Sequence, residues 1–113
     1  MKTYIFSENH SGGSFWLKRA DYEALARHGW TLPTNEDKPF YKADDDVPYN
    51  WRHNIEGAFN TIREAVEAFE KATGRDFFEQ GCSCRGAPFS INSYEYGEYI
   101  SGDSVGRTVV RPW

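Results

Sequence analysis

The sequence predicts an α+β fold, a single mostly antiparallel sheet with two helices packed on one face. Two segments have apolar residues at helical spacing, and the strand-like segments come as neighbouring pairs separated by turn residues. The third observation is length: 113 residues fit the usual size of one domain. We therefore predict that residues 1–113 form a single globular domain.

The N-terminal residues predict a first hairpin. Residues 1–7, MKTYIFS, are rich in β-branched and aromatic side chains, and residues 14–17, SFWL, form a second short apolar run. The polar segment between them ends in Gly12 and Gly13, which suit a hairpin loop. A phosphate-binding loop is the less favoured interpretation, because the Walker lysine is missing and an apolar strand follows instead of a helix.

A short helix is predicted from Arg19 to His28, with Gly29 in the left-handed position after it. Tyr22, Leu25 and Ala26 share one face of this helix. An extended segment follows from Trp30, and a short strand is predicted over residues 40–42.

The longest predicted helix begins between Asn50 and Asn54, runs to about Thr73 and is closed by Gly74. Its apolar residues recur at spacings of four and three, which defines one face turned to the core. These residues are Ile55, Phe59, Ile62, Val66 and Phe69. We expect this apolar face to be buried.

Beyond this helix, residues 89–101 and 104–110 are predicted to be strands joined by a turn at Gly102-Asp103. The resulting order is strand, strand, helix, short strands, helix, strands. Hairpins in sequence with interspersed helices favour an antiparallel sheet.

Charge and hydropathy exclude some classes of function. The chain has 13 basic and 17 acidic residues and a formal charge of −4, which argues against broad, sequence-independent binding to nucleic acid or to anionic membranes. No apolar run approaches the roughly 18 residues of a membrane span, and the segment MKTYIFSENH lacks the apolar centre of a signal peptide. A cytoplasmic location and no membrane association are therefore predicted.

The sequence contains no complete pattern of a metal site or of a catalytic site. Cys82 and Cys84 are the weak metal candidates, but two thiols one residue apart supply only half of a zinc site. His10, His28 and His53 would have to converge from separate elements. No metal or cofactor is therefore predicted, and the alternative function is a small metal- or thiol-dependent enzyme that uses His10, Cys82 and Cys84.

Tyr94, Tyr96 and Tyr99 allow two interpretations. With the arginines near them they could stack on single-stranded nucleic acid, or they could pack against one another across strands. The negative charge of the chain favours cross-strand packing.

Two segments carry a resemblance to a known group of proteins. HSGGSFWLKRADYEALARHGW, at residues 10–30, and TGRDFFEQGCSCRGAPFSI, at residues 73–91, resemble segments of small proteins encoded by phages of actinobacteria. In that group the second segment has a third cysteine and a histidine, where this chain has Arg85 and Phe89. The resemblance implies a phage-encoded accessory protein in the host cytoplasm and implies no particular activity.

The sequence as a whole predicts a non-enzymatic protein that binds another protein, of host or phage origin. Aromatic residues make up 17% of the chain, and Trp, Tyr and Arg are enriched at interface hot spots. The predicted contact residues are Tyr41, Tyr49 and Trp51, around the acidic segment at 44–46, and Trp113. The oligomeric state and the identity of the partner are left open.

Overall fold

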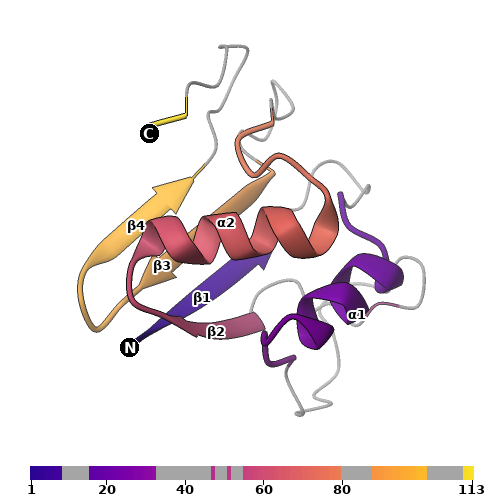
Figure 1. Cartoon of the computed structure of the whole chain (residues 1–113), viewed down its shortest axis with the longest axis horizontal. Coiled ribbons are helices and arrows are strands. Elements are labelled where there is room, and N and C mark those ends of the chain that lie inside the picture. The colour runs from indigo at the N-terminus through magenta and orange to yellow at the C-terminus, as the bar shows by residue number, and fades with distance from the viewer. Residues whose placement is uncertain (9–15, 33–46, 48–50, 52–54, 80–87, 102–110) are drawn as a thin grey trace.

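The computed structural model describes residues 1–8, 16–32, 47, 51, 55–79, 88–101 and 111–113 (Figure 1). Its centre is a four-stranded antiparallel sheet with the strand order β2-β1-β3-β4. The strands are β1 (Lys2–Glu8), β2 (Ile55–Phe59), β3 (Phe89–Ser93) and β4 (Glu98–Ser101). The register places Tyr4 opposite Gly57 and Ile5 opposite Asn92.

Helix α2 (Ile62–Thr73) connects β2 to β3 across β1 (Figure 1). Since β2 and β3 both run antiparallel to β1, they are parallel to each other. The connection therefore has to pass over the central strand, and α2 covers one face of the sheet.

Helix α1 (Arg19–Arg27) lies on the same side and packs against α2. Tyr22 and Leu25 on its inner face are fully buried. The hydroxyl of Tyr22 reaches Glu8, which faces the helices from the end of β1. The predicted fold class, an antiparallel sheet with two helices on one face, is confirmed.

The core between sheet and helices is built largely from aromatic rings. Phe6, at the centre of β1, stacks on Phe69 of α2 with 4.7 Å between ring centroids. Its ring also contacts Trp30 at 6.2 Å and Phe89 at 5.9 Å. Burial of these large rings lets a short chain enclose much apolar surface.

The predicted continuous helix up to Thr73 is wrong in its first half. Residues Ile55–Phe59 form strand β2, and α2 begins only at Ile62, where the Thr61 hydroxyl accepts a hydrogen bond from the Glu64 amide. Of the predicted apolar face, Ile55, Val66 and Phe69 are fully buried, whereas Phe59 and Ile62 are half-buried. The predicted end is confirmed, because Gly74 follows the helix with φ 72°.

The prediction that residues 14–17 form a strand paired with residues 1–7 is also wrong for Trp16 and Leu17, the two of these four residues that the structure describes. Trp16 and Leu17 belong to no strand, and their backbone amides donate hydrogen bonds to the carboxylate of Glu8. The neighbours of β1 are β2 and β3, both distant in sequence. The loop with Gly12 and Gly13 and the short strand predicted over 40–42 lie outside the described residues.

The C-terminal strands differ from the prediction in the position of their turn. Residues 89–101 are not one strand but the hairpin of β3 and β4, which reverses at Tyr94–Gly97. Gly97 has φ 68°, a left-handed conformation that glycine adopts at no steric cost. The predicted turn at Gly102-Asp103 and the strand over 104–110 lie outside the described residues.

Candidate functional site

The largest exposed apolar side chains gather at the β3–β4 turn. Among the described residues, four large hydrophobic side chains are exposed to solvent. They are Met1 (86%), Tyr94 (81%), Tyr99 (66%) and Tyr96 (48%). We call these four residues the tyrosine patch.

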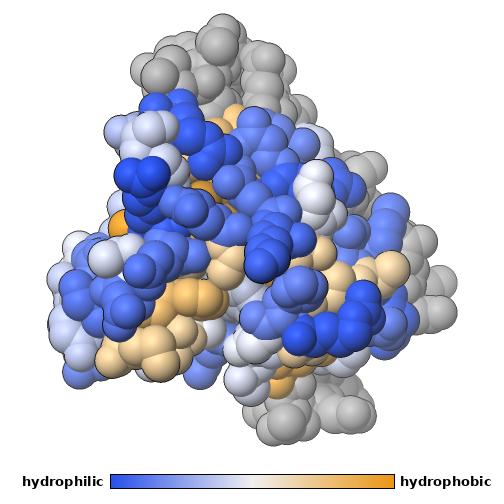
Figure 2. Space-filling view, viewed as in Figure 1, coloured by the Kyte–Doolittle hydropathy of each residue, from blue (hydrophilic) through white to orange (hydrophobic). Residues whose placement is uncertain are grey.

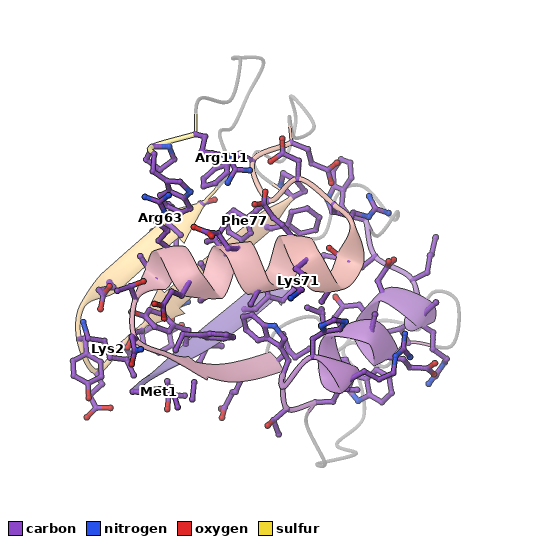
Figure 3. All side chains as sticks on the ribbon, viewed as in Figure 1. Met1, Lys2, Arg63, Lys71, Phe77 and Arg111 are labelled. Atoms are coloured by element: carbon purple, nitrogen blue, oxygen red, sulfur yellow. The ribbon has the colours of Figure 1, made fainter. Side chains whose placement is uncertain are left out.

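The patch forms because the N-terminus lies beside the β3–β4 turn, as Figure 1 shows. Tyr94 and Tyr96 are turn residues, and Tyr99 follows in β4. The Nζ of Lys2 lies 5.1 Å from the centre of the Tyr96 ring, which brings the start of β1 to the turn. Met1 and Lys2 are labelled at this corner of the molecule in Figure 3.

Polar contacts hold the turn to β1. Glu98 accepts hydrogen bonds from Lys2 Nζ at 2.7 Å and from the Tyr4 hydroxyl at 3.0 Å. The hydrogen bond from Lys2 lowers the pKa of Glu98, while burial and then the bond to Glu98 raise the pKa of Tyr4 to about 12. The base of the patch is thus fixed, while the tyrosine rings project from it.

The cross-strand packing expected for Tyr94, Tyr96 and Tyr99 is not found. None of the three rings makes a ring–ring contact with another residue in the described part of the chain. Tyr99 lies opposite the small Asn92, and the other two rings stand outside the strands. These aromatic side chains are therefore available to a partner.

The two predicted contact tryptophans that the structure describes lie in different places. Trp51 is half-buried against the core, and the guanidinium of Arg19, at the start of α1, lies 5.0 Å from its ring centre. Trp113 is also half-buried and packs edge-on against Phe78 at 5.6 Å. The guanidinium of Arg63, in α2, lies 5.4 Å from the centre of the Trp113 ring. The other two predicted contact residues, Tyr41 and Tyr49, lie outside the described residues.

Arg111 explains the position of Trp113. Its guanidinium bonds to Glu70 of α2 and, at 3.2 Å, to Asp76. The same group lies 5.0 Å from the ring centre of Phe78 and 5.9 Å from that of Trp113. The hydrogen bond to Glu70 raises the pKa of Arg111 further above its usual value. Trp113 is thus part of a structural contact with α2 as well as a candidate for binding.

Glu8 is the most buried charged side chain among the described residues, and it was not among the site residues predicted from the sequence. Its side chain is fully buried, and its two oxygens accept hydrogen bonds from the amides of Trp16 and Leu17 and from the hydroxyl of Tyr22. The strand pattern contained a signal for this burial. Side chains alternate between the two faces of a strand, so Glu8 lies on the same face of β1 as the buried Tyr4 and Phe6. A carboxylate enclosed in this way joins sheet and helix and presents no surface to a substrate.

The residues of the alternative enzyme function, His10, Cys82 and Cys84, lie outside the described residues. Within the described ranges, no group of three or more His, Cys, Asp or Glu side chains is placed to hold a metal ion. None of the helices that the structure describes is long and apolar enough to cross a membrane.

No protein-family model, curated protein or solved structure matches the chain. The resemblance to phage proteins therefore depends on the two sequence segments alone.

Proposed function

We propose that this protein is a non-enzymatic accessory protein that acts by binding another protein, and that the tyrosine patch is its contact surface. The observation that carries the proposal is the exposure of Met1, Tyr94, Tyr96 and Tyr99 at one corner of the sheet. Exposed apolar patches of this kind mark interaction sites on soluble proteins. Tyrosine is among the residues that contribute most to interface hot spots.

The tyrosine patch has the physical properties of an interface centre. A tyrosine ring offers a large apolar area but has few rotatable bonds, so little side-chain entropy is lost when a partner covers it. Its hydroxyl keeps a hydrogen bond in the complex. The contacts of Glu98 with Lys2 and Tyr4 hold the turn in place before binding, which lowers the ordering cost.

The partner class follows from the sequence resemblance and from charge. A host or phage protein in the cytoplasm of a bacterial host is the natural partner of a phage accessory protein. The formal charge of −4 disfavours nucleic acid. Trp51 and Trp113 remain secondary contact candidates, since both are half-buried.

The test is binding with matched surface variants. The tagged protein first captures its partner from a bacterial lysate, and titration calorimetry then measures affinity with the purified partner. The variant Tyr94→Ser/Tyr99→Ser should weaken binding about 1,000-fold, because two hot-spot side chains at about 2 kcal/mol each are lost. The control variant Glu23→Ser/Lys71→Ser changes two exposed helical residues and should bind as the wild type does.

Two outcomes would contradict the proposed contact surface. A tyrosine variant with unchanged circular dichroism and unchanged affinity would remove the patch from the interface. The same affinity loss in the control variant would point to the helical side as the binding surface.

A further inference from the structure

The sheet face opposite α2 carries a row of side chains that crosses all four strands. Tyr4 and Phe6 point to the helices, so the alternate residue Ile5 points to the other face. Ile5, in β1, pairs with Glu56 of β2 on one side and with Asn92 of β3 on the other. Asn92 in turn pairs with Tyr99 of β4. We call Glu56, Ile5, Asn92 and Tyr99 the Asn92 row.

Solvent reaches both ends of this row. Glu56 in β2 is exposed, and so is the Tyr99 ring in β4. Thr3 and Ala58, a cross-strand pair one step along the same face, are exposed as well. The row is continuous with the tyrosine patch, because Tyr99 belongs to both.

The middle of the row contains an unsatisfied hydrogen-bond acceptor. Asn92 is only 8% exposed, and its Oδ1 is buried without a hydrogen-bond partner. A buried polar atom left unpaired costs about 1–3 kcal/mol. A ligand that brings a donor to Oδ1 therefore recovers free energy that the unbound protein lacks.

The charge of this face selects the ligand. On the described strands it carries Glu56 and neither lysine nor arginine, and Glu95 is exposed in the adjoining turn. The helical side bears the described cations of α1 and α2, and Figure 2 shows that side as largely hydrophilic. An acidic, aromatic surface with a free acceptor suits a cationic donor and repels phosphate.

We propose that the Asn92 row binds an arginine-bearing extended segment of the partner protein. This inference rests on the proposed function and names the chemistry of the partner. One guanidinium stacks on the exposed Tyr99 ring and donates to Asn92 Oδ1, and arginine suits this better than lysine because it is planar and carries five donors. Because Oδ1 is buried in the unbound protein, the atoms that cover it have to move before the guanidinium can reach it.

The geometry also sets the spacing of charges in the partner segment. Strands lie about 4.8 Å apart, so Glu56, three strands from Tyr99, is about 14 Å away from it. An extended chain rises about 3.4 Å per residue, so a second cation about four residues from the first reaches Glu56.

The probe is a synthetic peptide with two arginines four residues apart, titrated into the labelled full-length protein and followed by NMR. Shifts should concentrate on the side-chain amide of Asn92 and on Tyr99. The same peptide with citrulline in place of arginine, isosteric but uncharged, should cause no comparable shifts. Each of Tyr99→Ser and Glu56→Gln should weaken peptide binding about two- to fivefold, the effect of one exposed cation–π or ion-pair contact.

The matched control is Glu23→Gln, an exposed carboxylate on α1, which should leave peptide affinity unchanged. Asn92→Leu removes the acceptor and should weaken peptide binding. If that variant does not fold, Tyr99→Ser and Glu56→Gln still decide the proposal. Equal shifts with the citrulline peptide, or stronger shifts on the row with a thymidine oligonucleotide, would overturn it.

The partner protein separates this inference from the proposed function. Suppose that Tyr94→Ser/Tyr99→Ser abolishes binding of the partner, while neither Glu56→Gln nor the replacement of arginine by citrulline changes peptide binding. This result would support the proposed function and reject the cationic segment. Retention of the partner by all variants would reject both the tyrosine patch as the contact surface and the cationic segment.

Discussion

The hydroxyl of Tyr22, in α1, donates a hydrogen bond of 2.5 Å to Oε2 of Glu8 at the end of β1, and both side chains are fully buried. The other carboxylate oxygen accepts from the amides of Trp16 and Leu17. A buried charge is tolerated only where donors surround it. Glu8 therefore ties the sheet, the first helix and the segment before that helix to one another.

Tyr22→Phe should lower the free energy of unfolding by about 1–3 kcal/mol, because a buried carboxylate oxygen loses a donor while the ring and its packing remain. Urea denaturation measures the difference. Tyr94→Phe removes the hydroxyl of an exposed tyrosine and serves as control, with no measurable change expected. Equal midpoints for Tyr22→Phe and wild type would show that the hydroxyl contributes nothing.

Phe69 should be far more sensitive to truncation than Phe59. The Phe69 ring is fully enclosed and lies 4.7 Å from Phe6 and 5.0 Å from Phe89, so Phe69→Ala leaves a cavity and should cost about 3–5 kcal/mol. Phe59 is half-buried, so Phe59→Ala should cost clearly less. Similar losses for the two variants, measured by urea denaturation, would contradict the burial pattern.

The parts of the fold that the sequence predicted correctly are those with two concurring local signals. Helix α1 has an apolar face and a glycine after its end, and Gly29 indeed has φ 96°. Helix α2, which is the second half of the helix that was predicted, combines an apolar face with Gly74 at its end. Strand β1 has both alternation and β-branched or aromatic residues.

The start of α2 was misplaced because one spacing fits two structures. Ile55 and Phe59 are four residues apart, which puts them on one face of a helix and also on one face of a strand. Their burial alternates through Gly57, as in a strand. The sequence did contain a sharper signal, since Thr61 followed by Glu64 is a capping-box pattern, and the structure uses both side chains at the helix start.

The candidate site could be predicted only in part. The sequence pointed to Tyr94, Tyr96 and Tyr99 as a group of aromatic residues, but their exposure to solvent depends on which residues form the turn. With the turn at 94–97, Tyr94 and Tyr96 leave the strands and project into solvent. The Asn92 row could not be foreseen at all, because it depends on the registers of β1 with β2 and β3, which join residues distant in sequence.

Gly57 should not tolerate a side chain, even though it lies in a strand. A Cβ at this position would lie 2.5 Å from Cε2 of Phe59 and 2.9 Å from Cε3 of Trp30. Gly57→Ala should therefore cost about 1–3 kcal/mol by overpacking. The exposed neighbour provides the control, Ala58→Ser, with little effect expected.

The double variant Gly57→Ala/Phe59→Leu identifies the clash. Leucine lacks the ring that the new methyl group would displace, so the double variant should lose less stability than the sum of the two single changes. Additive losses would mean that the Phe59 ring is not what excludes a side chain at position 57.

Tyr4 should make stability fall at alkaline pH. Burial, and then its hydrogen bond to Glu98, raise the pKa of Tyr4 from 10.0 to about 12 in the folded protein. The folded state therefore holds this proton more tightly than the unfolded state does, and the stabilisation is complete below pH 10. It declines as pH rises from 10 towards 12, because the unfolded chain loses the proton first. Chemical denaturation between pH 8 and 11 should show a steeper loss of unfolding free energy in the wild type than in Tyr4→Phe, which cannot ionise. Tyr99→Phe should keep the steep descent of the wild type, whereas parallel curves for wild type and Tyr4→Phe would show that Tyr4 ionises alike in the folded and unfolded states.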